Sequence, residues 1–403
     1  MRTLRLPALL AGALICYALP SMAGTTLHAI VEQAWQRSVA VTTLAARQEE
    51  AAAAHDVAQS WLAGAPVLGL SDRSDRWLDN RRLREAEVSI AAAVLLPGQA
   101  SARQQLAARA GEDVEAQRHR ARLEVAGQVR LRLWEAAAAH EMLAEKEGHL
   151  HHLEDLHEDV QRRVKAGDLA RSDGLLTGQE VLAAQAEVAQ ARTRARDALH
   201  RFELLTGVPE LPAPEPEPLQ PVPPDAMSQH AHLRAAETAE QRARANVALA
   251  AAGVQAPPTV TLAMRRERDS VTPESTRSIG IAVHVPLGGK LRNRPAETLA
   301  ATQLATASAE LREAQAALAL DFTAARQQLV DVEEALQAAT VRAGLLREHT
   351  ALFEQAFKLG ERSLAELLRS QTLRHEAEVA VRQQRVALGL AHARLNQAQG
   401  ILP

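Results

Sequence analysis

The chain has 403 residues, of which 47% are apolar and only 2% aromatic, and its formal net charge at pH 7 is −3. A compact enzyme core usually contains more Phe, Tyr and Trp, whereas a chain rich in Ala, Leu, Val, Arg, Glu and Gln suits long helices packed side by side. Because the chain has no overall positive charge, nucleic acid is not an expected partner. The sequence contains no motif for a phosphate loop, a serine hydrolase, a zinc finger or a dinucleotide site, so neither an enzyme nor a cofactor is predicted.

The first 23 residues have the three parts of a secretory signal peptide. Two arginines lie in MRTLRLP, the apolar run ALLAGALICYALP follows, and SMAG offers a small-residue cleavage site after Ala23. A membrane anchor is the alternative, but the apolar run is short for a membrane span. Cys16, the one cysteine of the chain, lies inside this segment, so the exported chain is expected to have neither a disulfide nor a thiolate metal ligand.

The rest of the chain repeats one pattern of motifs. Pro66 in the first half corresponds to Pro258 in the second, and Gly167 to Gly360, at an offset of about 190 residues. The stretch IAAAVLLPGQ likewise resembles IGIAVHVPLGG. Between the halves, PAPEPEPLQPVPPD contains too many prolines for a helix or a central strand. The sequence thus predicts a first repeat at 24–211, a Pro-rich linker at 212–226 and a second repeat at 227–403.

Each repeat is predicted to contain a helix, a β-hairpin, a very long helix and a final helix, in that order. Leu153, Leu156, Val160 and Val164 recur at spacings of three and four residues, which indicates a narrow apolar seam between long helices. An ordinary antiparallel coiled coil is the alternative explanation of this seam. The helices are expected at 26–63, 99–164 and 170–206 in the first repeat and at 227–252, 290–356 and 363–398 in the second.

Alternating residues between the helices predict β-strands. Val88, Ile90 and Val94 are separated by polar or small residues, and the same alternation recurs at 259–264 and 278–285. Two strands in each repeat make four strands in the chain, which are too few to close a barrel and would leave open edges. Several chains are therefore expected to combine their strands. An apolar outer face and a polar inner face on an exported chain favour a barrel in the outer membrane.

Taken in order, these elements resemble the outer-membrane efflux protein family, the TolC-type channels, over about residues 25–400. The segments that carry the resemblance are RVKAGDLARSDGLLTGQEVLAAQAEV, HRFELLTGVPELP and FKLGERSLAELLRSQTLRHEAEVAV. The resemblance implies a mainly α-helical fold with a small β part. Duplicated long helical hairpins form a periplasmic α-barrel, and four strands from each chain of a homotrimer form a twelve-stranded β-barrel in outer-membrane lipid.

The same resemblance implies a passive export duct that a periplasmic adaptor protein joins to an inner-membrane RND pump. GDLARSDGLL is most similar to the heavy-metal cation-efflux branch of the family, so metal cations are the expected cargo. A multidrug or protein-secretion duct of the same fold is the alternative. Two other classes fit less well: an adaptor would have a single hairpin flanked by β-rich domains, and a secreted structural coiled coil would lack the alternating strands.

The resemblance also assigns roles to the two glycine turns. Gly167 and Gly360 are expected at the periplasmic tips of the two hairpins, where the adaptor docks. Glycine suits such a bend because it has no Cβ to obstruct the reversal of the backbone. Simple helix ends without a docking role are the alternative.

Four residues near these turns are expected to form a gate, again by resemblance. Asp173 and Arg362 would pair between neighbouring hairpins, Phe357 stands where a tyrosine is expected, and Glu366 would line an acidic constriction. Arg369 occupies the position of a second acidic residue, which departs from the family pattern and weakens the case for a doubly acidic ring. Ordinary charge pairs at a solvated tip are the alternative.

The stretch EKEGHLHHLEDLHED at 145–159 is rich in histidine. On a helix, His149 and His152 share a face, and Glu145 lies one turn below His149. Imidazole and carboxylate groups together suit Zn²⁺, Cu²⁺, Ni²⁺ or Co²⁺, so these three residues are candidate metal ligands. Solvated histidines on a polar helix face are the alternative.

Overall fold

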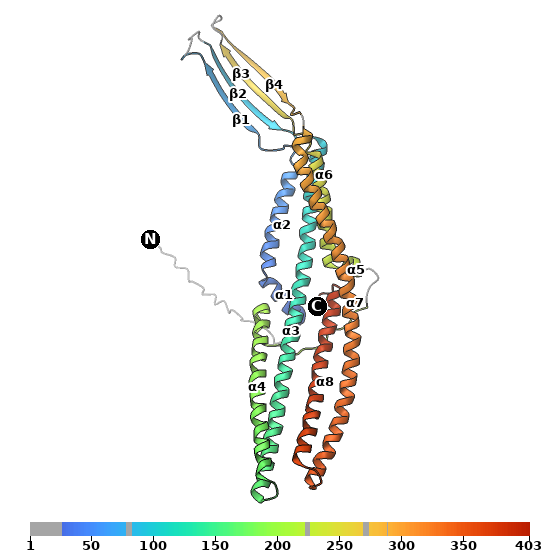
Figure 1. Cartoon of the computed structure of the whole chain (residues 1–403). Coiled ribbons are helices and arrows are strands. Elements are labelled where there is room, and N and C mark those ends of the chain that lie inside the picture. Colours follow the sequence, from blue (N-terminus) through green and yellow to red (C-terminus); the bar gives the residue numbers. More distant parts are fainter. Residues whose placement is uncertain (1–25, 78–82, 222–225, 269–273, 288) are drawn as a thin grey trace, which may run out of the picture.

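The computed structural model describes residues 26–77, 83–221, 226–268, 274–287 and 289–403. The predicted signal peptide lies outside these ranges. The molecule is an elongated bundle of helices with a small sheet at one end and two helical turns at the other (Figure 1). Among the described residues, no helix is both long and apolar enough to cross a membrane.

The helices and strands follow the predicted order in both repeats. The first repeat contains α1 (Leu27–Arg37), α2 (Val39–Ala58), β1 (Val67–Ser74), β2 (Arg84–Ala93), α3 (Pro97–Ala166) and α4 (Arg171–Thr206). The second repeat contains α5 (Ala226–Gln229), α6 (Ala231–Ala252), β3 (Thr259–Arg268), β4 (Ser275–His284), α7 (Gly289–Lys358) and α8 (Leu364–Ala398). The two very long helices are confirmed, since α3 and α7 each have 70 residues.

The prediction of a single helix at 26–63 is wrong, because this segment forms two helices. Ser38 has an extended backbone, with φ −73° and ψ 143°, and separates α1 from α2. The second of these helices also ends early, at Ala58. The residues after it lead into the sheet, where Leu62 forms an isolated antiparallel bridge with Val94. Pairing with the sheet thus replaces the last helical turn that the sequence predicts.

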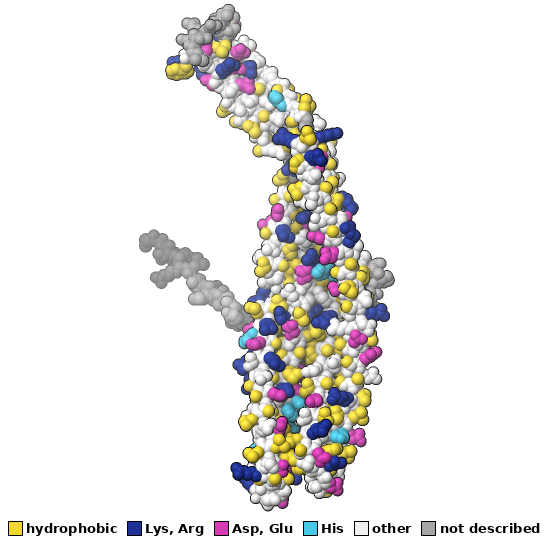
Figure 2. Space-filling model, viewed as in Figure 1, with side chains coloured by type: hydrophobic (Ala, Val, Ile, Leu, Met, Phe, Trp, Pro, Cys, Tyr) yellow, Lys and Arg dark blue, Asp and Glu magenta, His cyan; other side chains and the backbone are white. Residues whose placement is uncertain are grey.

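The four strands form one antiparallel sheet in the order β1-β2-β3-β4. Because β2 pairs with β3, the hairpins of the two repeats lie side by side (Figure 1). The register places Leu70, Val88, Met264 and Ile279 in one row across the strands, and each is more than half exposed. The sheet therefore carries an apolar face that nothing in the described part of the chain covers. In Figure 2, hydrophobic side chains are visible along the sheet, and charged side chains of both signs gather near its distal end.

Both helical hairpins turn at a glycine with a left-handed backbone. Gly167 has φ 88° and Gly360 has φ 75°, a region that residues with a Cβ rarely adopt. The amide of Asp168 donates to the carbonyl of Arg163, and the amide of Glu361 donates in the same way to that of Ala356. These hydrogen bonds close the ends of α3 and α7 in the same helix-ending motif.

A hydrophobic cluster joins α1 to the first hairpin. Ile30, Trp35, Val129, Leu133 and Phe202 belong to it, and all are almost fully buried. Burying one such side chain contributes about 1.5–3 kcal/mol. The cluster therefore anchors the short helix α1 against α3 and α4.

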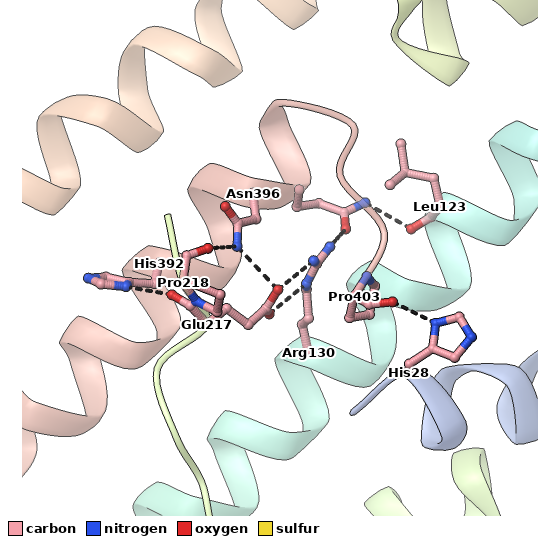
Figure 3. A network of polar contacts seen from close by, with 9 residues as sticks. His28, Leu123, Arg130, Glu217, Pro218, His392, Asn396 and Pro403 are labelled. Carbon is pink, nitrogen blue, oxygen red and sulfur yellow. Dashed lines mark hydrogen bonds and ion pairs between the residues drawn. The ribbon is translucent and has the colours of Figure 1, made fainter. Parts of the chain in front are cut away.

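A buried ion pair attaches the Pro-rich linker to α3. Arg130 donates from Nε to Glu217 Oε1 at 2.8 Å and from Nη2 to Glu217 Oε2 at 2.6 Å (Figure 3). The two side chains are only 2% and 10% exposed. The third guanidinium nitrogen, Nη1, donates to Gln397 Oε1 of α8 at 2.7 Å. One arginine thus holds the linker and the last helix of the second repeat together.

Helix α8 contributes further hydrogen bonds to the same network. Asn396 Nδ2 donates to Glu217 Oε2 and to the carbonyl of Pro218, each at 3.2 Å (Figure 3). His392 Nδ1 lies 2.9 Å from the carbonyl oxygen of Glu217. Gln397 Nε2 donates back to the carbonyl of Leu123 in α3 at 2.9 Å. Glu217 and Pro218 of the linker are therefore held between α3 and α8.

Close packing continues this α3–α8 contact toward the tips. Trp134 of α3 is 4% exposed and packs directly on Gly389 of α8. A Cβ at position 389 would lie 1.9 Å from the Cη2 atom of the Trp134 ring. Glycine at this position allows the indole to fill the space between the helices.

We expect Glu217→Gln to lower the free energy of unfolding by about 3 kcal/mol, because it leaves the buried Arg130 charge without its counter-ion. The thermal midpoint of the purified protein measures the effect. Glu215→Gln is the matched control, since Glu215 lies on the same linker but is exposed. Equal midpoints for the two variants would contradict the role of the ion pair.

We expect Gly389→Ala to destabilise the protein by about 1–3 kcal/mol, because the new methyl group overpacks the Trp134 ring. Gly344→Ala is the control: nothing lies within 4 Å of a Cβ at this exposed helical position. The control is expected to be neutral or slightly stabilising, because alanine favours a helix over glycine. Thermal midpoints of the two variants check the difference.

Candidate functional site

The candidate site is the lower half of the bundle, where the two hairpins end. The α3–α4 turn at Gly167 and the α7–α8 turn at Gly360 lie at the same end of the molecule, opposite the sheet (Figure 1). Helix α3 packs against α8, so the two hairpins are joined along this length. The predicted gate residues all lie near these two turns.

Asp173 begins the helix that follows the first turn. Its Oδ2 atom accepts a hydrogen bond from the backbone N–H of Ala170 at 3.2 Å. The carboxylate also lies in the first turn of α4, where negative charge is favoured by the helix dipole. In this chain, therefore, Asp173 stabilises the start of α4.

Arg362 and Glu366 form an equivalent arrangement at the second turn. Arg362 Nη1 donates to Glu366 Oε1 at 2.9 Å, and its guanidinium lies 5.2 Å from the centre of the Phe353 ring. Glu366 Oε2 accepts from the amide and the hydroxyl of Ser363 at 3.0 and 3.1 Å, while the Ser363 hydroxyl caps the start of α8. The backbone hydrogen bond from Ser363 is the main cause of a lowered pKa for Glu366.

The predicted pair of Asp173 with Arg362 is not formed between the described residues of one chain. Each side chain instead stabilises the helix that begins after its own turn. A pair of Asp173 with Arg362 between two neighbouring chains stays a prediction. Arg369, which departs from the family pattern, is exposed.

Phe357 is a packing residue that joins the two hairpins. It is 7% exposed and belongs to a cluster with Val160 of α3 and with Leu364 and Leu367 of α8. The guanidinium of Arg163 lies 5.2 Å from the centre of its ring, on the α3 side. The aromatic ring at this position therefore ties the end of α7 to α3.

The histidine-rich stretch meets α8 through Glu145. His375 Nδ1 lies 3.0 Å from Glu145 Oε1, and Arg382 Nε lies 2.8 Å from Glu145 Oε2. The Glu145 side chain is only 9% exposed. Burial raises the pKa of Glu145, and the charge of Arg382 counteracts that shift. The carboxylate is therefore committed to two partners from the second repeat.

Two imidazole rings stack beside this carboxylate. The centroids of His149 and His375 are 3.8 Å apart, and the rings are inclined by 14°. Burial lowers the pKa of His149 from 6.5 to about 4, with a further contribution from the neighbouring His375. Burial is also the main cause of a lowered pKa for His375. Both rings are therefore neutral at pH 7, which allows them to stack without repulsion.

The predicted metal ligands are not arranged as a metal site. Within the described ranges, no group of three or more His, Cys, Asp or Glu side chains is placed to hold a metal ion. The physical reason is that Glu145 contacts His375 and Arg382, while His149 stacks on His375. The Nε2 atom of His152 is buried and has no hydrogen-bond partner among the described residues.

The partners of Glu145 are not evident from the local sequence. His375 and Arg382 lie more than 200 residues away from it along the chain. The sequence does contain one indication of the covered face of α8. Leu368, His375 and Arg382 follow one another at intervals of seven residues, which is the repeat of a helix–helix seam. That signal indicates the face of α8 that is covered, but it does not identify the residue that covers it.

Comparisons with known proteins show what this fold is. No protein-family model matches the chain, and no curated protein matches its sequence. The solved structures that it resembles include a membrane protein from Pseudomonas aeruginosa, with 18% identity, a TM-score of 0.76, and coverage of 93% of this chain and 90% of that one. The open state of the Neisseria gonorrhoeae MtrE outer membrane channel has 17% identity, a TM-score of 0.72, and coverage of 93% and 89%. The Vibrio cholerae outer membrane protein VceC has 16% identity, a TM-score of 0.75, and coverage of 94% and 96%.

The chain therefore has the fold of the TolC-type outer-membrane channels. The predicted fold class is confirmed, with long duplicated helical hairpins and a four-stranded antiparallel sheet. At these identities the likeness establishes the fold.

We expect acidification from about pH 7.5 to about pH 5.5 to weaken the α3–α8 contact at His149, at a cost of about 1 kcal/mol. In this window the unfolded chain takes up a proton at His149 and the folded chain does not, so the folded state loses stability as the pH falls. Glu145 opposes this effect, because its raised pKa makes the folded state bind protons more readily.

Thermal midpoints at the two pH values, measured for wild type and for His149→Gln, check this expectation. The variant should lose less stability on acidification than wild type does. His119→Gln is the control, because His119 is exposed on the same helix. If wild type and both variants lose the same amount, His149 is not the group responsible.

Proposed function

We propose that this protein is the outer-membrane channel of a tripartite efflux system and acts as a passive export duct. The observation that carries the proposal is the sheet, which has an uncovered apolar face and two open edges at β1 and β4. An open edge exposes unpaired backbone groups, which a second strand can pair. Three chains would supply twelve strands and could close a barrel without edges.

The burial pattern of the sheet supports this barrel. In β3, the apolar residues Val260, Leu262 and Met264 are exposed, whereas the alternate residues Thr259 and Thr261 are half-buried. The sheet thus curls toward the face that carries the small and polar side chains. A barrel closed in this sense would have its apolar face toward lipid and its polar face toward the lumen.

The helices also have exposed apolar side chains that neighbouring chains would cover. Helix α7 has 70 residues, which at 1.5 Å per residue span roughly 105 Å. Apolar side chains along it are 60–69% exposed, namely Leu299, Leu320, Val341, Leu345 and Leu352. Contact with α3 or α4 of an adjacent chain would bury them and extend the barrel into a helical tunnel across the periplasm.

The proposed partners are a periplasmic adaptor protein and an inner-membrane RND pump. The turns at Gly167 and Gly360 stand at the end farthest from the sheet, where a periplasmic adaptor protein would dock and connect the duct to an inner-membrane RND pump (Figure 1). Asp173 and Arg362 lie at these tips on different hairpins. Each is held only by contacts near the surface, so a pair between neighbouring chains would require little rearrangement.

Heavy-metal cations are the proposed cargo. The segment GDLARSDGLL supports this assignment through its similarity to the cation-efflux branch, and Glu366 supplies one acidic side chain near the second turn. Arg369 is the opposing feature, because a basic residue disfavours cations there. A multidrug or protein-secretion duct is the alternative cargo class.

The mass of the mature protein, extracted from outer membranes in mild detergent, tests the assembly. We expect a trimer; a water-soluble monomer would contradict the channel and favour a secreted coiled coil. Planar-bilayer conductance then tests the gate. Asp173→Ala or Arg362→Ala should raise the open fraction by up to roughly ten-fold, because each symmetric pair contributes modestly and three act together.

Asp168→Ala is the control for the gate, since it removes the same charge from the same turn. If the control raises the conductance as much as Asp173→Ala does, the effect comes from the overall charge of the tip and not from a specific pair. The reversal potential in the same bilayers reports the ion selectivity. Cation selectivity is the expected result for a metal-cation duct, and anion selectivity would contradict it.

A further inference from the structure

Four arginines lie together on the apolar face of the sheet, beyond its hydrophobic rows. In the register of the strands, Arg84 of β2 is directly opposite Arg268 of β3, and Arg266 of β3 is directly opposite Arg277 of β4. Each lies an even number of residues from the apolar side chains of its own strand, such as Met264 in β3, so all four share the apolar face. We call these four residues the arginine cluster.

Such an arrangement is unfavourable for the sheet on its own. Like charges directly opposite each other on neighbouring strands repel and destabilise the pairing. Arg84 has one carboxylate nearby, Asp72, whose Oδ1 lies 3.6 Å from Arg84 Nε. Within the described part of the chain, Arg266, Arg268 and Arg277 form no ion pair. Three exposed guanidinium groups therefore have no counter-ion among the described residues.

The opposite face of the same strands provides a contrast. Arg265, the neighbour of Arg266, lies 3.0 Å from Glu85 and 2.9 Å from Glu87, both on β2. Arg265 is thus neutralised by the protein itself, although Arg73, on the same inner face, forms no ion pair with a described residue. Arg266, Arg268 and Arg277 are exposed and are therefore accessible to a counter-ion from the surroundings.

The position of the arginine cluster indicates which surroundings these are. Hydrophobic rows extend from Val94, which follows β2 directly, to Val88 of β2, and the first arginine row lies opposite Ala86. The eight residue steps from Val94 to Ala86 span about 27 Å along the strand, and the ten steps to Arg84 span about 34 Å. With the strand tilt of about 40° that is usual in barrels, the two arginine rows lie roughly 20 and 26 Å along the barrel axis, on either side of the height of about 25 Å of the apolar band. The arginine cluster therefore lies where the apolar band ends and lipid headgroups begin.

We propose that the arginine cluster binds the phosphate groups of anionic lipid at the outer edge of the membrane. The planar guanidinium group matches phosphate oxygens with two parallel hydrogen bonds, and a phosphate between two opposed arginines would remove their repulsion. A lipid is favoured over free phosphate because the arginine cluster is continuous with an apolar face that acyl chains would cover. The inference rests on the proposed function, since it requires the sheet to be in a membrane.

The test uses three purified forms of the mature protein: wild type, the double variant Arg266→Gln/Arg277→Gln, and the control Arg326→Gln/Arg342→Gln. The control removes two exposed positive charges from α7, away from the sheet. Each form is reconstituted into vesicles of phosphatidylcholine, with or without diphosphoryl lipid A. Density flotation measures insertion, and native mass spectrometry counts the lipid A molecules retained after extraction in mild detergent.

We expect all three forms to float equally, and the Arg266→Gln/Arg277→Gln form alone to retain less lipid A. Each arginine removed should weaken the binding about five-fold. Equal retention by the three forms would overturn the inference while leaving the channel intact. If none of them floats, the proposed function fails and the inference with it.

A thermal-shift experiment separates the two sources of phosphate. Lipid A should raise the thermal midpoint of wild type more than that of the Arg266→Gln/Arg277→Gln form, and inorganic phosphate at a matched concentration should have no such effect. An equal rise with inorganic phosphate would show an anion site without preference for lipid, and would overturn the assignment of the source.

Discussion

The buried ion pair between Arg130 and Glu217 connects the parts of this molecule that the chain itself separates. It holds the Pro-rich linker against α3, and the Arg130 guanidinium also reaches Gln397 of α8. A buried charge is unfavourable unless its partner stays in place, so the pair tolerates one arrangement of the two repeats and penalises others. The relative position of the hairpins therefore depends on a contact near the middle of the molecule.

From this point the α3–α8 contact continues to the tips through different kinds of interaction. Trp134 packs on Gly389, then Glu145 contacts His375 and Arg382, and near the turns Val160 shares a hydrophobic cluster with Leu364 and Leu367. Apolar packing stabilises this contact along its length, and the charged contacts determine which residues of α3 and α8 meet. Any motion that widens a tunnel between the hairpins has to separate these groups or carry both hairpins together.

The sheet differs from the helices, because the described residues of a single chain leave its apolar face, its edge strands and three residues of the arginine cluster without partners. Its apolar face, its open edges at β1 and β4 and its arginine cluster all lack partners in the described part of the chain. Lipid, neighbouring strands and anionic headgroups would satisfy them in turn. The contacts between the two hairpins are thus made within one chain, whereas the proposed trimer and its membrane would supply the partners of the strands and of the exposed apolar side chains of α7.

The sequence by itself determined the kinds of elements, their order and the faces they present, since these are local properties. A two-residue period predicts a strand, spacings of three and four predict a helix face, and a glycine such as Gly167 marks a turn. The tertiary structure alone decided which residues meet: Glu145 contacts His375 instead of forming a metal site, Asp173 caps its own helix, and Arg266 lies opposite Arg277. Periodicity reports which face of an element is covered, but the partner on that face is set by packing between segments hundreds of residues apart.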